Sequence, residues 1–115
     1  MTRAKVFQVL MLSILLGINN FTHAADDAFL LDVKVSAENG EREFQYMLGN
    51  IYNTGTSHPQ NYIKAYVWFS LSAAQGHEDA KNNRDIVVAK LTPQDLSKAQ
   101  AIVTVCFESN YKDCE

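Results

Sequence analysis

The chain has 115 residues, of which 47% are hydrophobic, and it carries 10 Lys and Arg against 13 Asp and Glu. This length fits one small domain with a small core. The acidic balance leaves no basic patch, so nucleic acid is not an expected partner.

The first 24 residues have the pattern of a secretory signal peptide. Arg3 and Lys5 precede the apolar run VLMLSILLGI, and Thr22 and Ala24 match the small-residue pattern of a cleavage site before Ala25. The apolar run is about half as long as the ~20 residues that a membrane span needs. The pattern therefore favours a cleaved signal over the alternative, an uncleaved membrane tether.

Cleavage would leave residues 25–115 as one exported domain, periplasmic or secreted, without a stable membrane span. Its 8 Lys and Arg against 13 Asp and Glu give a net charge of −5. An exported chain enters an oxidising compartment, so we expect Cys106 and Cys114 to form a disulfide. Two free surface thiols are the alternative.

The stretch at residues 26–39 is ambiguous between strand and helix. LDVKVSA alternates as a strand does, whereas Ala28, Leu31 and Val35 share one helical face. Gly40 supplies a stop of the kind that follows helices, so we expect a helix here.

The next apolar residues recur at helical spacing, which predicts a helix over residues 41–53 with one buried stripe. The stripe consists of Phe44, Met47, Leu48, Ile51 and Tyr52. Gly55 can end this helix, and Asn61 can cap the next one through its side-chain oxygen.

A third helix is predicted after Asn61, with Gly76 at its end. Its expected inward face consists of Tyr62, Ala65, Phe69, Ser72 and Ala73. We expect Trp68, the single tryptophan, to pack in the core between two antiparallel helices. A stacking platform for a ligand is the alternative.

Two further helices are predicted at residues 77–90 and from Pro93 onward. In the first, Ala80, Val87 and Val88 are expected to point inward. Thr92 is a capping residue before the second, Pro93 suits the first helical position, and Asp95 can complete the cap. The apolar face of this last helix would consist of Leu96, Ala99, Ile102, Val103 and Cys106.

Ala37 and Gly40 recur as Ala73 and Gly76 at a shift of 36 residues. A helix pair that recurs near this period is typical of an α-solenoid. The surrounding segment resembles a Sel1-like repeat of the TPR-like superfamily. The matching residues are Ala37, Gly40, Leu48, Gly49, Tyr52, Gly55, Ala65, Trp68, Ala73, Gly76 and Ala80.

This resemblance implies an all-α fold, a short α/α solenoid of antiparallel helix pairs with about five helices. It implies a protein–protein interaction adaptor or scaffold that catalyses no reaction, and the signal-peptide pattern makes this an exported one. Solenoids usually need about three repeats to bury a continuous core, and this chain shows one good unit. Its open end must therefore be capped or must pair with another surface, including a second copy of the chain.

The cysteine-rich relatives in this family pair cysteines with seven residues between them, the spacing of Cys106 and Cys114. Some of these relatives have been linked to β-lactam binding. A β-lactam-binding or hydrolysing protein is therefore one alternative function. A small inhibitor or immunity-type partner of one protein is another.

Few residues have the spacing that catalysis or metal binding requires. HEDAK, which begins at His77, has a lysine where the second ligand of H-E-x-x-H would stand. His77 and His58 are expected to be loop or cap residues. Ser109 and Lys112 match S-x-x-K, but no S-D-N or K-T-G accompanies them. We therefore predict no catalytic residue, metal site or cofactor.

In a helix-pair solenoid, the first helices of successive pairs line one face. On residues 41–53 and their equivalents 36 positions later, this face would carry Tyr46, Asn50, Asn82 and Ile86. An aromatic residue among amides and an apolar side chain is a composition typical of a protein contact. A solvated face with stray apolar groups is the alternative.

Overall fold

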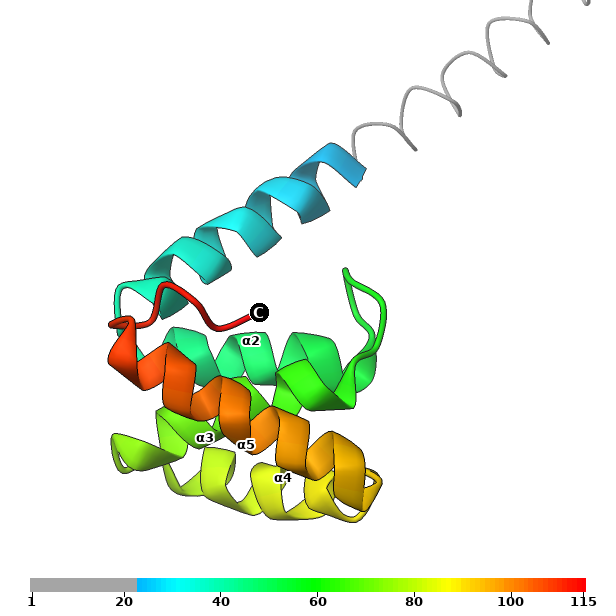
Figure 1. The fold of residues 1–115 in the computed structure, drawn as a ribbon. Helices are drawn as coiled ribbons and strands as arrows, with labels where there is room; N and C mark the ends of the chain where they lie inside the picture. The colour runs from blue at the N-terminus through cyan, green and yellow to red at the C-terminus, as the bar shows by residue number, and fades with distance from the viewer. Residues whose placement is uncertain (1–22) are drawn as a thin grey trace, which may run out of the picture. The chain divides into compact units, whose positions relative to one another are not determined.

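A computed structural model describes residues 23–115 (Figure 1). They form a helix over residues 23–38, then α2 (Arg42–Thr54), α3 (Tyr62–Ala74), α4 (Glu78–Val88) and α5 (Pro93–Glu108). Residues 23–115 contain no strand, so the expectation of an all-α solenoid with about five helices is confirmed. None of the helices within this range is long and apolar enough to cross a membrane.

The chain divides into two units, residues 1–30 and 31–115. Most of the expected signal peptide, residues 1–22, lies outside the described residues. The first described helix crosses the boundary between the units, and its residues from 31 onward belong with α2 to α5.

The structure has the expected helix where the sequence was ambiguous, but the face that Ala28, Leu31 and Val35 share is not its buried face. Val33 and Ala37 are buried, whereas Ala28, Leu31 and Val35 are exposed. Apolar residues lie on two sides of this helix, so their spacing alone does not select a face. The buried Gln45 side chain donates a hydrogen bond to the Ala37 carbonyl (3.2 Å), which fixes this end of the helix to α2.

Within residues 31–115, α3 packs against α2, α4 and α5. A helix covered on several sides needs apolar residues all round. Its buried residues are Ala65, Val67, Trp68, Phe69, Ser70, Leu71 and Ser72. The single inward face predicted for this helix was therefore too narrow, since Tyr62 and Ala73 are only half-buried while Val67 and Leu71 are fully buried.

The buried face of α2 is rotated from the predicted stripe. Leu48, Ile51 and Tyr52 are buried as expected, but Phe44 is half-buried and Met47 is exposed. Gln45 and Gly49 complete the buried face of α2 instead. A Cβ atom at Gly49 would lie 2.5 Å from Cδ1 of Phe69, so α2 and α3 approach each other at a point where only glycine fits.

The chain turns two corners with the same backbone geometry. At the first corner, the Gly40 N–H donates to the Ala37 carbonyl (3.0 Å) and the Glu41 N–H donates to the Ser36 carbonyl (3.2 Å). The equivalent two hydrogen bonds form 36 residues later, around Gly76. Both glycines have positive φ, 87° and 89°, as a Schellman motif requires. Since α2 and α4 also begin 36 residues apart, the weak sequence repeat corresponds to a structural repeat.

The predicted caps begin and end the helices. The Asn61 side chain accepts a hydrogen bond from the Lys64 N–H (3.0 Å), and the Thr92 hydroxyl accepts one from the Asp95 N–H (3.1 Å). Gly55 ends α2 in the left-handed conformation, with φ of 75°.

Candidate functional site

The predicted binding surface on α2 and α4 begins with Tyr46. The Tyr46 ring stacks on the His77 imidazole, with ring centroids 4.2 Å apart and planes 25° apart. It also lies against Phe69, at a tilted 6.0 Å. Tyr46 is half-buried, so one face of the ring is fixed by packing while part of the side chain reaches solvent.

Asn50 lies one turn further along α2, on the side that faces α4. Its Oδ1 accepts a hydrogen bond from Nδ2 of Asn83 (3.3 Å). Asn82 and Ile86 are exposed, and 56% of the Ile86 surface is accessible. The side chain that bridges the two helices is thus Asn83, the neighbour of the predicted Asn82. Tyr46, Asn50, Asn82 and Ile86 are called the α2–α4 surface below.

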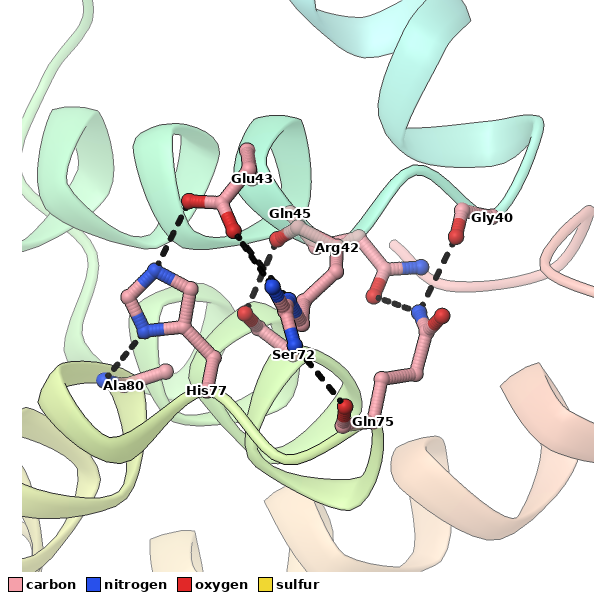
Figure 2. A network of polar contacts seen from close by, with 8 residues as sticks. All are labelled: Gly40, Arg42, Glu43, Gln45, Ser72, Gln75, His77 and Ala80. Atoms are coloured by element: carbon pink, nitrogen blue, oxygen red, sulfur yellow. Dashed lines mark hydrogen bonds and ion pairs between the residues drawn. The ribbon is translucent and has the colours of Figure 1, made fainter.

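His77 orders the edge of this surface (Figure 2). Its Nδ1 accepts a hydrogen bond from the Ala80 N–H (3.2 Å) and so caps α4. This leaves Nε2 to carry the proton, which it donates to Glu43 of α2 (3.0 Å). Desolvation raises the pKa of Glu43, but hydrogen bonds from Arg42 and His77 outweigh it, so the pKa lies below its ordinary value. His77 thus links the start of α4 to α2 while it supports the Tyr46 ring.

A second group of polar side chains joins the two glycine corners (Figure 2). The Gln75 side chain donates to the Gly40 carbonyl (3.0 Å) and to the Gln45 side chain (2.8 Å). The Ser72 hydroxyl donates to the Arg42 carbonyl (2.9 Å). These bonds fix the start of α2 against the end of α3. Gln45 is fully buried, and both polar atoms of its amide have hydrogen-bond partners.

Most residues that define the repeat pattern lie in the core. The buried members are Ala37, Leu48, Gly49, Tyr52, Ala65, Trp68 and Ala80. Ala73 is half-buried, and Gly55 and Gly76 are exposed at helix ends with positive φ. Their pattern therefore reports packing and turns.

Cys106 and Cys114 form a disulfide, with Cα atoms 4.5 Å apart. The bridge folds residues 109–115, called the closing segment below, back from the end of α5. Both cysteines are buried.

The S-x-x-K match in the closing segment does not form a nucleophile pair. The Ser109 hydroxyl donates to the Cys106 carbonyl (3.0 Å) and accepts the N–H groups of Lys112 (3.2 Å) and Asp113 (2.9 Å). The Lys112 amine donates instead to the Glu38 carbonyl (3.2 Å). Ser109 therefore serves as a turn residue, and the geometry gives no support to β-lactam acylation.

The closing segment brings Glu115 to a cluster that the sequence did not indicate. Its Oε1 accepts hydrogen bonds from the Tyr52 hydroxyl and from Nε1 of Trp68 (3.2 Å). Its Oε2 lies 2.6 Å from Nζ of Lys34 and 3.8 Å from Nζ of Lys64. These partners are up to 81 residues away in the chain, so no local pattern could have indicated the cluster.

The cluster shifts the pKa values of Glu115 and Tyr52. Burial raises the pKa of Glu115. Hydrogen bonds from Lys34 and Tyr52 and the nearby Lys64 charge lower this pKa by more, so it lies below its ordinary value. Burial, together with donation to the Glu115 carboxylate, raises the pKa of the Tyr52 hydroxyl. Both effects favour an ionised Glu115 beside a neutral tyrosine.

No group of three or more His, Cys, Asp or Glu side chains within residues 23–115 is arranged to hold a metal ion. His77 is a cap, as described above. His58 lies in the loop before α3, and its ring and the Tyr52 ring form a T-shaped pair with centroids 5.2 Å apart.

Comparison with known proteins identifies the repeat. Residues 42–77, which hold α2, α3 and the cap of α4, match the family model of the Sel1 repeat. No curated protein and no solved structure matches the chain. The family match coincides with the structural repeat between the two glycine corners, and residues 42–77 accordingly form a Sel1 repeat.

Proposed function

We propose that the chain is an exported adaptor or scaffold that binds another protein through the α2–α4 surface and catalyses no reaction. Sel1 repeats form helical repeat folds that mediate protein interactions. The proposal places the contact on the first helices of the two successive pairs.

The observation that carries this proposal is the fixed Tyr46 ring, and the exposed Ile86 of α4 adds to it. Stacking on His77 and packing on Phe69 hold the ring before any partner arrives. A side chain that is already ordered loses less conformational entropy on binding, which is one reason why aromatic residues dominate protein interfaces. Ile86 supplies apolar area to bury, and the amide of Asn82 can donate and accept hydrogen bonds.

Two features support export. The first 24 residues have the pattern of a signal peptide, and the two cysteines lie within bonding distance of each other. Disulfides persist in oxidising compartments and are rare in reducing ones.

The proposal is tested by capture from an envelope fraction with residues 25–115 as bait. Ile86→Asp and Tyr46→Ala should each weaken capture by about tenfold or more, as expected for central interface residues. Val35→Asp is the matched control, because Val35 is a similarly exposed apolar residue on the first described helix, at 49% against 56% for Ile86. Circular dichroism confirms that each variant is folded.

Equal capture by all variants would contradict the proposed surface. Loss with Val35→Asp alone would move the contact to the first described helix. Intact mass of the chain from envelope extracts tests export separately, since a mass that includes Met1 would contradict signal cleavage.

A further inference from the structure

The Glu115 carboxylate is surrounded by donors from three helices. Tyr52 comes from α2, Lys64 and Trp68 come from α3, and Lys34 comes from the first described helix. These four residues are called the carboxylate site below. The Glu115 side chain is 19% exposed, so most of its surface is covered by this site and its surroundings.

Two donors of the carboxylate site belong to the packing between α2 and α3. Tyr52 and Trp68 are fully buried in the contact between α2 and α3. The Lys64 amine also lies over the Tyr52 ring, 5.3 Å from its centroid. Because a buried hydroxyl and a buried indole N–H are costly to leave without an acceptor, the site requires an acceptor at this point.

The chemistry of the site selects a carboxylate. An ionised carboxylate offers two acceptor oxygens and no donor, and here one oxygen meets two neutral donors while the other meets two ammonium groups. Hydrogen bonds of this charge-assisted kind are about twice as strong as neutral ones. A carboxamide would turn an NH2 group toward two of these donors.

A groove beside the site extends the surface available to a ligand. It has a volume of about 570 Å³, and it is lined by Lys98, Ala101, Ile102 and Val105 of α5 and by Asp113 and Glu115 of the closing segment. The apolar residues of this lining suit a peptide in which an apolar residue lies close to the acidic one. The closing segment already presents an acidic residue here.

We propose that Lys34, Tyr52, Lys64 and Trp68 form a binding site for an acidic side chain in a peptide segment of another protein, and that Glu115 occupies this site within the chain. None of the four residues belongs to the α2–α4 surface, so the proposal does not rest on the proposed function. The disulfide anchors Cys114 beside Glu115 and keeps the local concentration of this carboxylate high. A second peptide therefore competes only when Glu115 is removed or the bridge is opened.

The first experiment empties the site in the full chain and keeps the disulfide. Glu115→Ala removes a CH2 and a carboxylate, which together are the heavy atoms of acetate. Increasing acetate should raise the melting temperature of Glu115→Ala and shift the emission of Trp68, the single tryptophan. Wild type should respond to acetate only as it responds to chloride at equal ionic strength. Acetamide should have no effect on either protein.

The second experiment supplies the ligand as a peptide. The probe is acetylated SNYKDSE, which is residues 109–115 with serine in place of Cys114. It should bind the full chain that carries Cys106→Ser and Cys114→Ser and should not bind the disulfide-intact wild type. The same peptide with glutamine in place of its glutamate should bind about tenfold more weakly or worse. Lys34→Met should weaken the glutamate peptide selectively.

The proposal is overturned if acetate affects Glu115→Ala and wild type alike. It is also overturned if the glutamate and glutamine peptides bind equally. Circular dichroism establishes whether the double serine variant folds. If it does not, the peptide is titrated against Glu115→Ala, whose disulfide is intact, and absence of binding there overturns the proposal.

Discussion

The contact between Gly49 and Phe69 can be tested by one methyl group. Alanine in a helix interior is normally more stable than glycine by about 1 kcal/mol, so helix propensity predicts that Gly49→Ala stabilises the chain. Packing predicts the opposite. The added Cβ would lie 2.5, 2.6 and 3.0 Å from three atoms of the Phe69 ring.

The packing effect is expected to win. Carbon atoms in contact prefer about 3.5–4.0 Å, so the ring would have to move by roughly 1 Å. Phe69 is fully buried, and the shift must therefore pass to its neighbours. Overpacking of this kind costs about 1–3 kcal/mol, and three close atoms favour the upper end. After the gain in helix propensity, we expect a net loss of about 2 kcal/mol, or roughly 8–16 °C in the melting temperature of a domain this size.

The measurement is thermal unfolding of wild type and Gly49→Ala, followed by circular dichroism. The same substitution in a Phe69→Leu background is the control, because a smaller side chain leaves room for the methyl group. Gly49→Ala should then be less destabilising, with a coupling of about 1 kcal/mol or more. A melting temperature at or above that of wild type would refute this reasoning, as would an equal loss in both backgrounds.

Three further predictions concern the core and the closing segment. Trp68→Ala should destabilise the chain by about 3–5 kcal/mol because the indole is fully buried, and urea unfolding measures this; a stable fold that has lost a ligand would support the platform role instead. Thiol titration of exported protein should find no free thiol, and two titratable thiols or a disulfide-linked dimer would contradict this. Reduction of Cys106–Cys114 should lower the stability of the fold by about 2–3 kcal/mol and should raise hydrogen exchange first between Leu96 and Cys106. The pKa of Glu115 is lower in the folded state than its ordinary value of 4.5, so the stabilisation by its carboxylate is present above that value and is lost as pH falls through the folded pKa. Thermal melts from about pH 6 to pH 3 should therefore show a steeper loss of stability in wild type than in Glu115→Gln. Parallel curves would contradict this prediction.

The helix ends were predictable because their signals are local. Asn61 and Thr92 accept the expected backbone N–H groups, and Gly55 and Gly76 have the positive φ that their positions after helices suggested. A cap depends on a side chain and a backbone group three residues away. Such short-range chemistry can be read directly from a sequence.

The buried faces were less predictable because partners on other elements select them. In the first described helix, apolar residues lie on both sides, and the structure buries Val33 rather than Leu31. In α2, Gln45 is fully buried although its side chain is polar, because Ala37 and Gln75 supply partners for its amide. Hydropathy spacing counts apolar residues and does not register a polar group that is satisfied on burial.

The candidate sites show the same contrast. The sequence indicated Tyr46 and Asn50 on α2, and the 36-residue shift added Asn82 and Ile86 on α4, but the hydrogen bond between these two helices comes from Asn83. The supporting role of His77 had a local signal, since it stands in the capping position between Gly76 and a helical stretch. The carboxylate site had none, because it depends on how the closing segment folds.

The closing segment explains how a chain with so few repeats can cover its core. In a longer solenoid each repeat contacts only its neighbours, so the ends require separate caps. Here the disulfide starts the segment back from α5, the Tyr111 ring lies against Gly40, and Lys112 reaches the Glu38 carbonyl. Glu115 then joins the segment to the first described helix, to α2 and to α3. Residues 31–115 are thereby closed by contacts between distant parts of the chain, which favours cooperative unfolding over unfolding repeat by repeat. Tyr52 and Trp68, which belong to the repeat pattern, therefore have two structural roles. Their rings fill the core, and their polar atoms bind the closing segment that covers it.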